Sequence, residues 1–159
     1  MRWTDGTIHD CKLTPLRRFS DDRGWLSEIF RVDEPPDGHE LAMAYISETL
    51  PGVARGPHEH VAQTDLFAFF DGIFRVFLWD NRVDSPTYGT RQVFVTGREN
   101  PTTLRVPPGV VHAYRCESEI PSLILNCPDK LYAGPGRAEE VDEVRHEDEP
   151  DSPFRMDGA

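Results

Sequence analysis

The strongest constraint on the fold of this chain is a series of short apolar runs, rich in branched and aromatic residues, that recurs along most of its length. Clusters of Gly, Pro, Asp and Asn separate the runs, for example at residues 34–38 and at Asp71 and Gly72. No segment has the periodicity of an amphipathic helix. Short strands without helices between them predict an all-β sandwich or barrel. The eight expected strands are residues 25–30, 41–47, 66–70, 73–79, 91–95, 103–106, 110–114 and 122–126.

The length and the distribution of charge indicate one small domain followed by an acidic tail. A chain of 159 residues fits a single domain, which we expect over residues 1–133. Residues 134–159 contain nine Asp or Glu and three Arg, and so carry −6 of the net charge of −11. This tail is expected either as a solvated, partly disordered surface or as a lid over a pocket, because Val141, Val144 and Phe154 give it apolar side chains to bury.

Several classes of function are excluded by features that the sequence lacks. It has no basic stripe that could displace counterions from phosphates, so a nucleic-acid partner is not expected. Its longest apolar runs are too short to cross a bilayer, and its first ten residues lack the apolar stretch of a signal peptide. We therefore expect no membrane association and a cytoplasmic location. Cys11, Cys116 and Cys127 have no CxxC spacing and are expected to be ordinary reduced thiols.

Three histidines lie in two short glycine-containing segments that we expect to meet at one point. His58 and His60 are one residue apart, and alternate residues of a strand point to the same face of a sheet. A Pro-Pro-Gly sequence at 107–109 predicts a sharp turn just before His112, and Asp65 could join the cluster. Such a polar group in an apolar barrel would suit either a metal ion or proton transfer. The remaining histidines, expected at the surface, are His9, His39 and His146.

The spacing of these residues resembles the two signature segments of the cupin superfamily. The first segment runs over residues 52–72 and the second over residues 107–112. Asp65 stands where the cupin pattern usually has Glu, and Cys116 stands where it usually has Asn. The resemblance implies a jelly-roll barrel, which agrees with the fold class that the strand pattern predicts independently.

A closer resemblance, to the dTDP-4-dehydrorhamnose 3,5-epimerase family of cupins, extends over residues 12–115. It implies an isomerase of nucleotide sugars that serves deoxysugar or surface polysaccharide biosynthesis. The motifs that carry it are FSDDRGWLSE at 19–28, Ser47, RGPH at 55–58, WDNRVDSPTYG at 79–89 and PGVVH at 108–112.

The resemblance also implies a reaction and roles for particular residues. The family inverts stereocentres beside the 4-keto group of a nucleotide-linked 6-deoxyhexose by taking a proton from one face and returning one to the other. His58, in the RG-x-H motif, would be the base, and His112 would line the sugar site. By position, the residues that would contact the nucleotide diphosphate-sugar are Arg23, Glu28 and Arg55, with Tyr132 packing on the nucleotide base.

Departures from the family pattern concern the proton chemistry more than the fold. The family's acid is a tyrosine at a place occupied here by Leu125 or Asn126, and neither can supply a phenolic proton. Asp65 stands where the family has a lysine, and His60 stands where it has a glutamine, which makes His60 a second candidate catalytic residue. In addition, two residues that usually contact the nucleotide are replaced by Met43 and Tyr45.

Three functional hypotheses remain open from the sequence. The first is an epimerase whose acid is Tyr132, Tyr114 or His60 and which acts at one carbon rather than two. The second is a nucleotide-sugar 3,4-ketoisomerase, whose family has a similar RG-x-H-x-H motif and a downstream Gln, here Gln63. The third is a metal-binding cupin or a nucleotide-sugar binder without catalytic activity. Fold alone does not distinguish these hypotheses.

Cofactors and assembly are also predicted from the resemblance. The family works without metal, so no cofactor is expected. A set of His58, His60, Asp65 and His112 would nevertheless suit zinc, iron, manganese or nickel. The family is typically a homodimer in which N-terminal strands pair across the interface, and we expect a homodimer here. The residues expected to supply the subunit contact are Trp3, Ile8 and Leu13.

Overall fold

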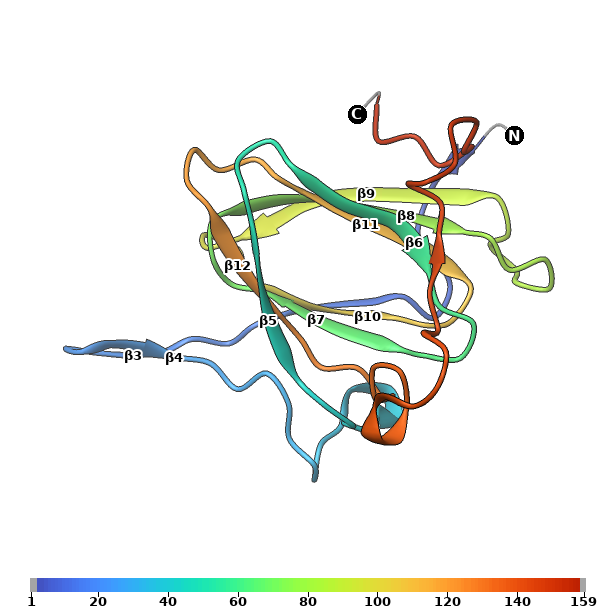
Figure 1. Cartoon of the computed structure of the whole chain (residues 1–159). Coiled ribbons are helices and arrows are strands. Elements are labelled where there is room, and N and C mark those ends of the chain that lie inside the picture. The colour runs from blue at the N-terminus through green and yellow to red at the C-terminus, as the bar shows by residue number, and fades with distance from the viewer. Residues whose placement is uncertain (1–2, 158–159) are drawn as a thin grey trace.

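The computed structural model describes residues 3–157, which form two facing β-sheets (Figure 1). Within this part of the chain, all strands pair antiparallel except β1 with β9. The six-stranded sheet has the order β1 (Thr4–Asp5), β9 (Thr90–Gly97), β8 (Ile73–Asp80), β11 (Val110–Cys116), β6 (Ala54–Glu59) and β13 (Val144–Arg145). The five-stranded sheet has the order β2 (Lys12–Pro15), β10 (Thr102–Val106), β7 (Asp65–Phe69), β12 (Ser122–Asn126) and β5 (Tyr45–Thr49). The predicted all-β barrel is confirmed.

The central strand β8 is buried on both faces, which explains why its sequence is an almost unbroken apolar run. Phe74 and Val76 belong to the core cluster inside the barrel. Phe77 and Trp79 point the other way, because side chains alternate along a strand, and join a second cluster on the outer face of the sheet. That outer cluster includes Phe154 from the tail, so the C-terminal segment covers an apolar face of the barrel.

The acidic tail packs against the body of the molecule. Strand β13 pairs with β6, and Phe154 is 5% exposed with its ring centroid 5.3 Å from that of Trp3. The segment before β13 passes the open end of the barrel between β5 and β6 (Figure 1). The packing of the tail favours a lid over a solvated extension, but of the three apolar side chains expected to bury only Phe154 is buried, while Val141 and Val144 are 42% and 38% exposed.

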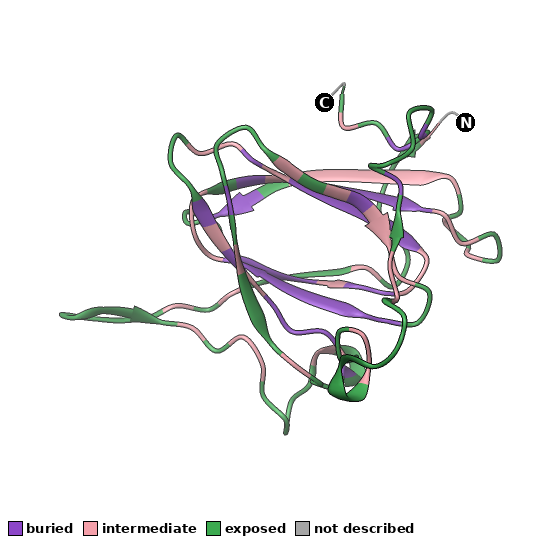
Figure 2. Ribbon diagram, in the orientation of Figure 1, coloured by how far each residue is buried: buried purple, intermediate pink, exposed green. Residues whose placement is uncertain are grey.

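The hairpin of β3 (Phe19–Asp21) and β4 (Gly24–Leu26) projects away from the barrel (Figure 1). All six of its strand residues are exposed (Figure 2). They include Phe19, Trp25 and Leu26, which are 43%, 41% and 61% exposed. The hairpin thus presents apolar side chains outside the core of its own chain.

The strand predictions are correct for the buried strands and wrong at the ends of two others. The run at 25–30 stops at Leu26, and the run at 41–47 begins only at Tyr45. Between them lies irregular chain with one 3-10 turn, η1 (Pro36–Gly38), because the prolines there have no N–H group to donate to a neighbouring strand. A second turn, η2 (Pro135–Arg137), lies in the tail. Over residues 3–157, no helix has the length and hydropathy of a membrane span.

Three predictions about exposure are wrong because loops and tail cover the barrel. His39 and His146 are 4% and 9% exposed rather than at the surface. His39 Nε2 lies 2.6 Å from the carbonyl oxygen of Cys127, and His146 Nε2 lies 2.9 Å from Glu59 Oε1. Ile8, expected at a subunit contact, is 1% exposed in the core of its own chain.

Candidate active site

A cavity of about 990 Å³ lies between the two sheets. Tyr45 of β5 and Phe67 of β7 line it from the five-stranded sheet. His58 of β6 and Tyr114 of β11 line it from the six-stranded sheet. Part of the segment 130–147 closes one side, so the tail contributes to the wall. The volume is that of a site for an organic small molecule.

The three histidines of the two cupin-like segments converge at this cavity. His58 of β6 and His112 of β11 are cross-strand partners with ring centroids 4.5 Å apart, and His60 is 5.8 Å from each. Gly56 has φ +80°, and a Cβ at that position would lie 2.4 Å from the carbonyl oxygen of His112. Glycine therefore permits the close approach of β6 to β11. The turn predicted at 107–109 is present, and its Gly109 N–H donates to the carbonyl oxygen of His60 at 2.9 Å.

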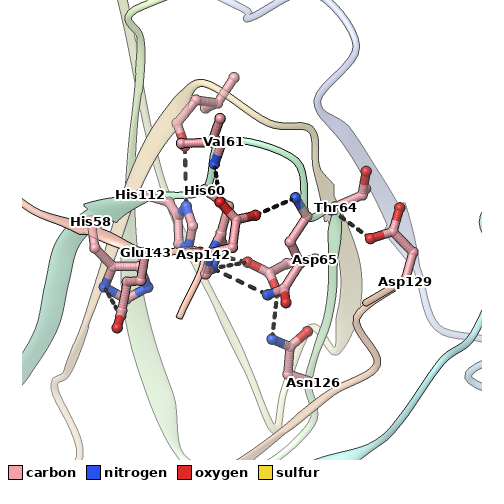
Figure 3. Close-up of polar contacts among 12 residues, drawn as sticks. His58, His60, Val61, Thr64, Asp65, His112, Asn126, Asp129, Asp142 and Glu143 are labelled. Atoms are coloured by element: carbon pink, nitrogen blue, oxygen red, sulfur yellow. Dashed lines mark hydrogen bonds and ion pairs between the residues drawn. The ribbon is translucent and has the colours of Figure 1, made fainter. Parts of the chain in front are cut away.

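Asp65 lies behind the histidines and is 1% exposed (Figure 3). Its Oδ2 is 3.2 Å from His60 Nε2 and 3.4 Å from His112 Nε2. Its Oδ1 accepts hydrogen bonds from the side-chain amides of Gln63 at 2.9 Å and Asn126 at 2.8 Å. The carboxylate thus has two amide donors at Oδ1 and the imidazole of His60 at Oδ2, as a buried charge requires, whereas His112 Nε2 makes no hydrogen bond with it.

The contact between His60 and Asp65 sets the charge of both groups. Burial alone would lower the pKa of His60, but the hydrogen bond to Asp65 raises it to about 9. Burial alone would raise the pKa of Asp65, but its contacts with His60 and His112 lower it to about 2. At neutral pH the pair is therefore an imidazolium and a carboxylate.

His58 has the opposite protonation state. Burial, and then the positive charge of His60, lower its pKa to about 4. Two carboxylates of the tail lie near its Nδ1, with Glu143 Oε1 at 3.7 Å and Glu147 Oε1 at 3.8 Å. At neutral pH His58 is an uncharged imidazole at the cavity wall with acidic groups beside one nitrogen, which is the arrangement of a general base.

Asp142 fixes the tail above the histidines. Its carboxylate accepts hydrogen bonds from the backbone N–H groups of Val61, Ala62 and Gln63 at 2.8, 2.9 and 2.8 Å. Its carbonyl oxygen also contacts Nδ1 of His60 (Figure 3). This one residue therefore connects the tail to the loop that follows β6 and orients His60.

Three tyrosines line the cavity in different environments. Tyr45 Oη accepts a hydrogen bond from Asn126 Nδ2 at 3.0 Å. Tyr114 is 5% exposed, and its hydroxyl lies 3.3 Å from Ser47 Oγ. Tyr132, on the loop after β12, is 55% exposed. Burial raises the pKa of Tyr45 to about 12, and burial also raises that of Tyr114. Both phenols are therefore protonated at neutral pH.

The structure brings together some of the residues predicted for the site and separates others. His58, His60, Arg55 and Tyr132 line the cavity, with His112 and Asp65 directly behind His60. Arg23 and Glu28 do not line it. Arg23 is on the projecting hairpin, 86% exposed and paired with Asp21, while Glu28 pairs with Arg31.

Other residues of the site were not predicted from the sequence. Glu143, Glu147 and Asp142 belong to an acidic segment whose charge alone indicates only a solvated surface. Their signal was the apolar residues nearby in the tail, which indicate a segment that packs. Asn126 and Tyr45 were identified as departures from the family pattern, but their direct pairing across β12 and β5 depends on strand register.

Comparison with known proteins gives the following matches. A family model described as dTDP-4-dehydrorhamnose 3,5-epimerase matches residues 5–148. The "Probable low-salt glycan biosynthesis epimerase Agl13" of Haloferax volcanii is 38% identical over 126 residues, which cover 79% of this chain and 81% of the relative. The "Spore coat polysaccharide biosynthesis protein SpsL" of Bacillus subtilis is 40% identical over 118 residues, which cover 74% of this chain and 78% of the relative.

A solved structure matches almost the whole chain. The crystal structure of a dTDP sugar isomerase from Desulfovibrio desulfuricans G20 has a TM-score of 0.82 and 30% sequence identity, and the match covers 96% of this chain and 94% of that one. The predicted cupin jelly-roll fold is therefore confirmed. The family model also covers the tail segment that lines the cavity, because it extends to residue 148.

Proposed function

The chain belongs to the dTDP-4-dehydrorhamnose 3,5-epimerase family, and we propose that it inverts a carbon next to the 4-keto group of a nucleotide-linked 6-deoxyhexose. Members of this family are isomerases. The relatives from Haloferax and Bacillus are named for the synthesis of a glycan and of a spore coat polysaccharide, and we propose a role of the same kind here. The observation that carries the proposal is the uncharged His58 at the cavity wall, with Glu143 and Glu147 beside its Nδ1.

In the first step His58 takes the proton from the carbon next to the ketone. The C–H bond breaks, its electron pair forms the enolate, and negative charge develops on the keto oxygen. The imidazolium that forms on His58 is stabilised by the carboxylates of Glu143 and Glu147, which lie 3.7 and 3.8 Å from Nδ1. An imidazole with a depressed pKa is available as a base throughout the neutral range.

The enolate needs a positive partner, and we propose that His60 provides it. The resemblance implies a lysine where this chain has Asp65, which reverses the sign of one charge. Asp65 in turn keeps His60 protonated, so a cation remains at the cavity wall two residues from the base. Both ring nitrogens of His60 already have partners, Nε2 in Asp65 and Nδ1 in the carbonyl oxygen of Asp142, and Asp65 offsets part of the charge, so His60 would act on the enolate through its field rather than through a hydrogen bond.

Arg55 is the residue of the cavity best placed to bind the diphosphate. Its Nε donates to Thr49 Oγ1 at 3.2 Å and its Nη2 to the carbonyl oxygen of Glu48 at 2.7 Å, so the guanidinium is held in one orientation. The remaining N–H groups of such a fork can bind phosphate oxygens. We propose that Tyr132, which lines the cavity and is 55% exposed, packs on the nucleotide base.

We further propose a homodimer, because Arg23 and Glu28 cannot serve the cavity of their own chain from the positions described above. The hairpin that carries Arg23 exposes Trp25 and Leu26, and a second copy of the chain would cover these apolar side chains. In that assembly the hairpin of one protomer would approach the cavity of its partner.

A bound transition metal is the second interpretation that a specific observation favours. Nitrogens of His58, His60 and His112 lie within 4.8 Å of one another, and His58 Nδ1 and His112 Nε2 lack a hydrogen-bond partner. Against this, the buried charges of His60 and Asp65 already balance without a cation, and Asp65 Oδ1 is occupied by two amide donors. We therefore propose that the reaction proceeds without metal.

The comparisons do not favour the remaining alternatives. A 3,4-ketoisomerase shares the RG-x-H-x-H motif, but the family that matches residues 5–148 is one of epimerases. A binder without activity would not require an uncharged His58 held beside two carboxylates. Epimerisation explains both the family and the site.

Incubation with dTDP-4-keto-6-deoxyglucose in heavy water, followed by NMR, tests the proposed function. We expect deuterium in the product next to the ketone, with inverted configuration at C3 or at both C3 and C5. A 3-keto product would instead support the ketoisomerase. Thermal shift with dTDP, UDP, GDP and CDP identifies the nucleotide, since a ligand that binds only the folded state raises the Tm. The proposal would be refuted if no deuterium exchange occurred and no nucleotide shifted the Tm.

A further inference from the structure

Inversion at a carbon needs a proton donor on the face of the sugar opposite the base. His58 lies on β6 of the six-stranded sheet, so the donor should come from the facing five-stranded sheet. The place at which the family resemblance implies a phenolic acid is Leu125 or Asn126, both on β12 of that sheet, and neither side chain can act as an acid at neutral pH. The reaction of the proposed function is therefore incomplete without another donor.

Tyr45 lies directly across the ladder from Asn126. The two residues are partners in the register of β5 with β12, and Asn126 Nδ2 donates to Tyr45 Oη at 3.0 Å. Along β5, Tyr45 shares its face with Ser47 and Thr49, whose hydroxyls contact Tyr114 and Arg55 inside the barrel. The phenol of Tyr45 therefore lies on the inner side of the sheet and lines the cavity.

The hydrogen bonds around Asn126 leave the hydroxyl proton of Tyr45 available. The amide nitrogen of Asn126 donates to Tyr45 Oη and also to Asp65 Oδ1 at 2.8 Å. Because an amide nitrogen is only a donor, Tyr45 must be the acceptor in this contact, and its own O–H is free to point into the cavity. The same amide would stabilise a phenolate left after the proton has been given up.

The other two tyrosines of the cavity fit the role less well. Tyr114 is on β11, in the same sheet as His58, and its hydroxyl is engaged with Ser47 at 3.3 Å. Tyr132 is on a loop at the rim rather than on a strand of the facing sheet, and its exposure of 55% is only somewhat above the 43% of Tyr45. Of the three tyrosines, Tyr45 is the one that lies on the facing sheet and accepts a hydrogen bond from a fixed side-chain amide.

We propose that Tyr45 is the general acid of the epimerisation, a role that rests on the proposed function. His58 removes the proton from one face of the carbon, and the electron pair forms the enolate. The Tyr45 O–H bond then breaks as a C–H bond forms on the other face, which restores the ketone. Tyr45 is left as a phenolate and His58 as an imidazolium, and exchange with solvent returns both to their starting states, so one proton enters and one leaves.

The phenolic acid is connected to the oxyanion side of the site by a continuous chain of contacts. It runs from His60 through Asp65 and Asn126 to Tyr45, with distances of 3.2, 2.8 and 3.0 Å. Asn126 thus holds Tyr45 in a fixed position relative to His60, the group proposed to stabilise the enolate. Tyr45 stays protonated over the neutral range, because its pKa is raised above the ordinary value of 10 although the side chain is 43% exposed.

The test compares exchange with inversion in Tyr45→Phe, with Tyr114→Phe and Tyr88→Phe as matched controls; Tyr88 is 44% exposed and lies outside the cavity lining. In heavy water, Tyr45→Phe should lose inverted product by about 100-fold or more. It should still place deuterium on the substrate carbon with retained configuration, because His58 can remove a proton and return a deuteron to the same face. Both control variants should invert within a few-fold of the unchanged protein. Unimpaired inversion in Tyr45→Phe, or the same separation of exchange from inversion in a control, would overturn the assignment.

A second variant keeps the shape of the site. With 3-fluorotyrosine at position 45, which lowers the phenol pKa, the ratio of inversion to exchange should change at neutral pH while nucleotide binding is unchanged. An unchanged ratio would exclude Tyr45 as the acid. If the unchanged protein shows no exchange with any nucleotide sugar, the proposed function fails and this inference with it. If exchange and inversion occur and their rates are the same in the Tyr45 variants, only this inference fails.

Discussion

Two histidines one residue apart are held in opposite protonation states. His58 is uncharged because it is buried and next to a cation, whereas His60 is charged because Asp65 lies 3.2 Å from it. A base and a stabilising cation can therefore come from the same short segment. This division of roles depends on Asp65, the residue at which the chain reverses the charge implied by its family.

The charge of His60 should appear in the pH dependence of stability. Its pKa in the folded state is about 9, above the ordinary value of 6.5, so its contribution is fully present below pH 6.5 and is lost as pH rises through 9. We expect the free energy of unfolding, measured by urea titration, to fall across this window. His60→Gln should lack this decline. Parallel curves for the two proteins between pH 6.5 and 9 would contradict the assigned ion pair.

Elemental analysis separates the two interpretations of the histidine cluster. We expect protein purified without a histidine tag to contain far less than one equivalent of zinc, iron, manganese or nickel. A chelator should then leave epimerisation unchanged. Near-stoichiometric metal that is lost in His60→Gln would instead assign the cluster, including His58, to a metal and remove His58 as the base.

At the scale of elements, the tail and the loop after β6 form one unit with the histidines that we propose for catalysis. Asp142 accepts three backbone hydrogen bonds from residues 61–63, and β13 pairs with β6. Glu143 and Glu147 reach His58 only because this connection holds the tail in place. The acidic segment is therefore part of the site.

Removal of the Asp142 carboxylate tests this connection. Asp142→Ala leaves three N–H groups without their acceptor, and we expect it to reduce the free energy of unfolding by about 1–3 kcal/mol. It should also slow proton exchange at the sugar, because Glu143 would no longer be held near His58. The matched control is Asp148→Ala, an exposed acidic residue of the same segment. Equal, small effects of both substitutions would mean that the tail does not support the site.

The sequence predicts the elements whose pattern is local and misses those whose contacts are distant. Strands β7, β8 and β11 are buried and apolar, so hydrophobic runs identify them. The short polar strands β1, β2 and β13 have no such signal and form because each pairs with a neighbouring strand. In the same way, the histidine spacing predicts the cluster, while Glu143 reaches His58 and Tyr45 faces Asn126 through pairings between segments far apart in the sequence.

At the scale of the whole molecule, one barrel closes most of its site by itself but leaves a hairpin without cover. The first and last segments that the structure describes pack on the outer face of the six-stranded sheet through Trp3 and Phe154. The hairpin of β3 and β4 has no comparable cover within residues 3–157 (Figure 2). We propose that a second copy of the chain covers its apolar side chains and contacts Arg23.

Sedimentation tests this assembly. We expect a homodimer of the 18.1 kDa chain at micromolar concentration. The double substitution Trp25→Ser and Leu26→Ser should shift the equilibrium toward monomer, because it removes the apolar surface of the hairpin. Val83→Ser, which changes a 74% exposed apolar residue elsewhere, is the control. A monomer in the unchanged protein would contradict the assembly and leave Arg23 without a role in binding.

The central claim is that His58 takes the proton from the sugar, while other residues of the site bind the nucleotide. The most direct measurement is the rate of deuterium exchange at the sugar carbon, together with the Kd of the nucleotide sugar, for the unchanged protein and for His58→Asn. We expect exchange to fall by about 100-fold or more while Kd changes less than a few-fold, because Arg55 and the cavity rim are unaltered. Exchange that persists in His58→Asn, or a parallel loss of exchange and binding, would contradict the account.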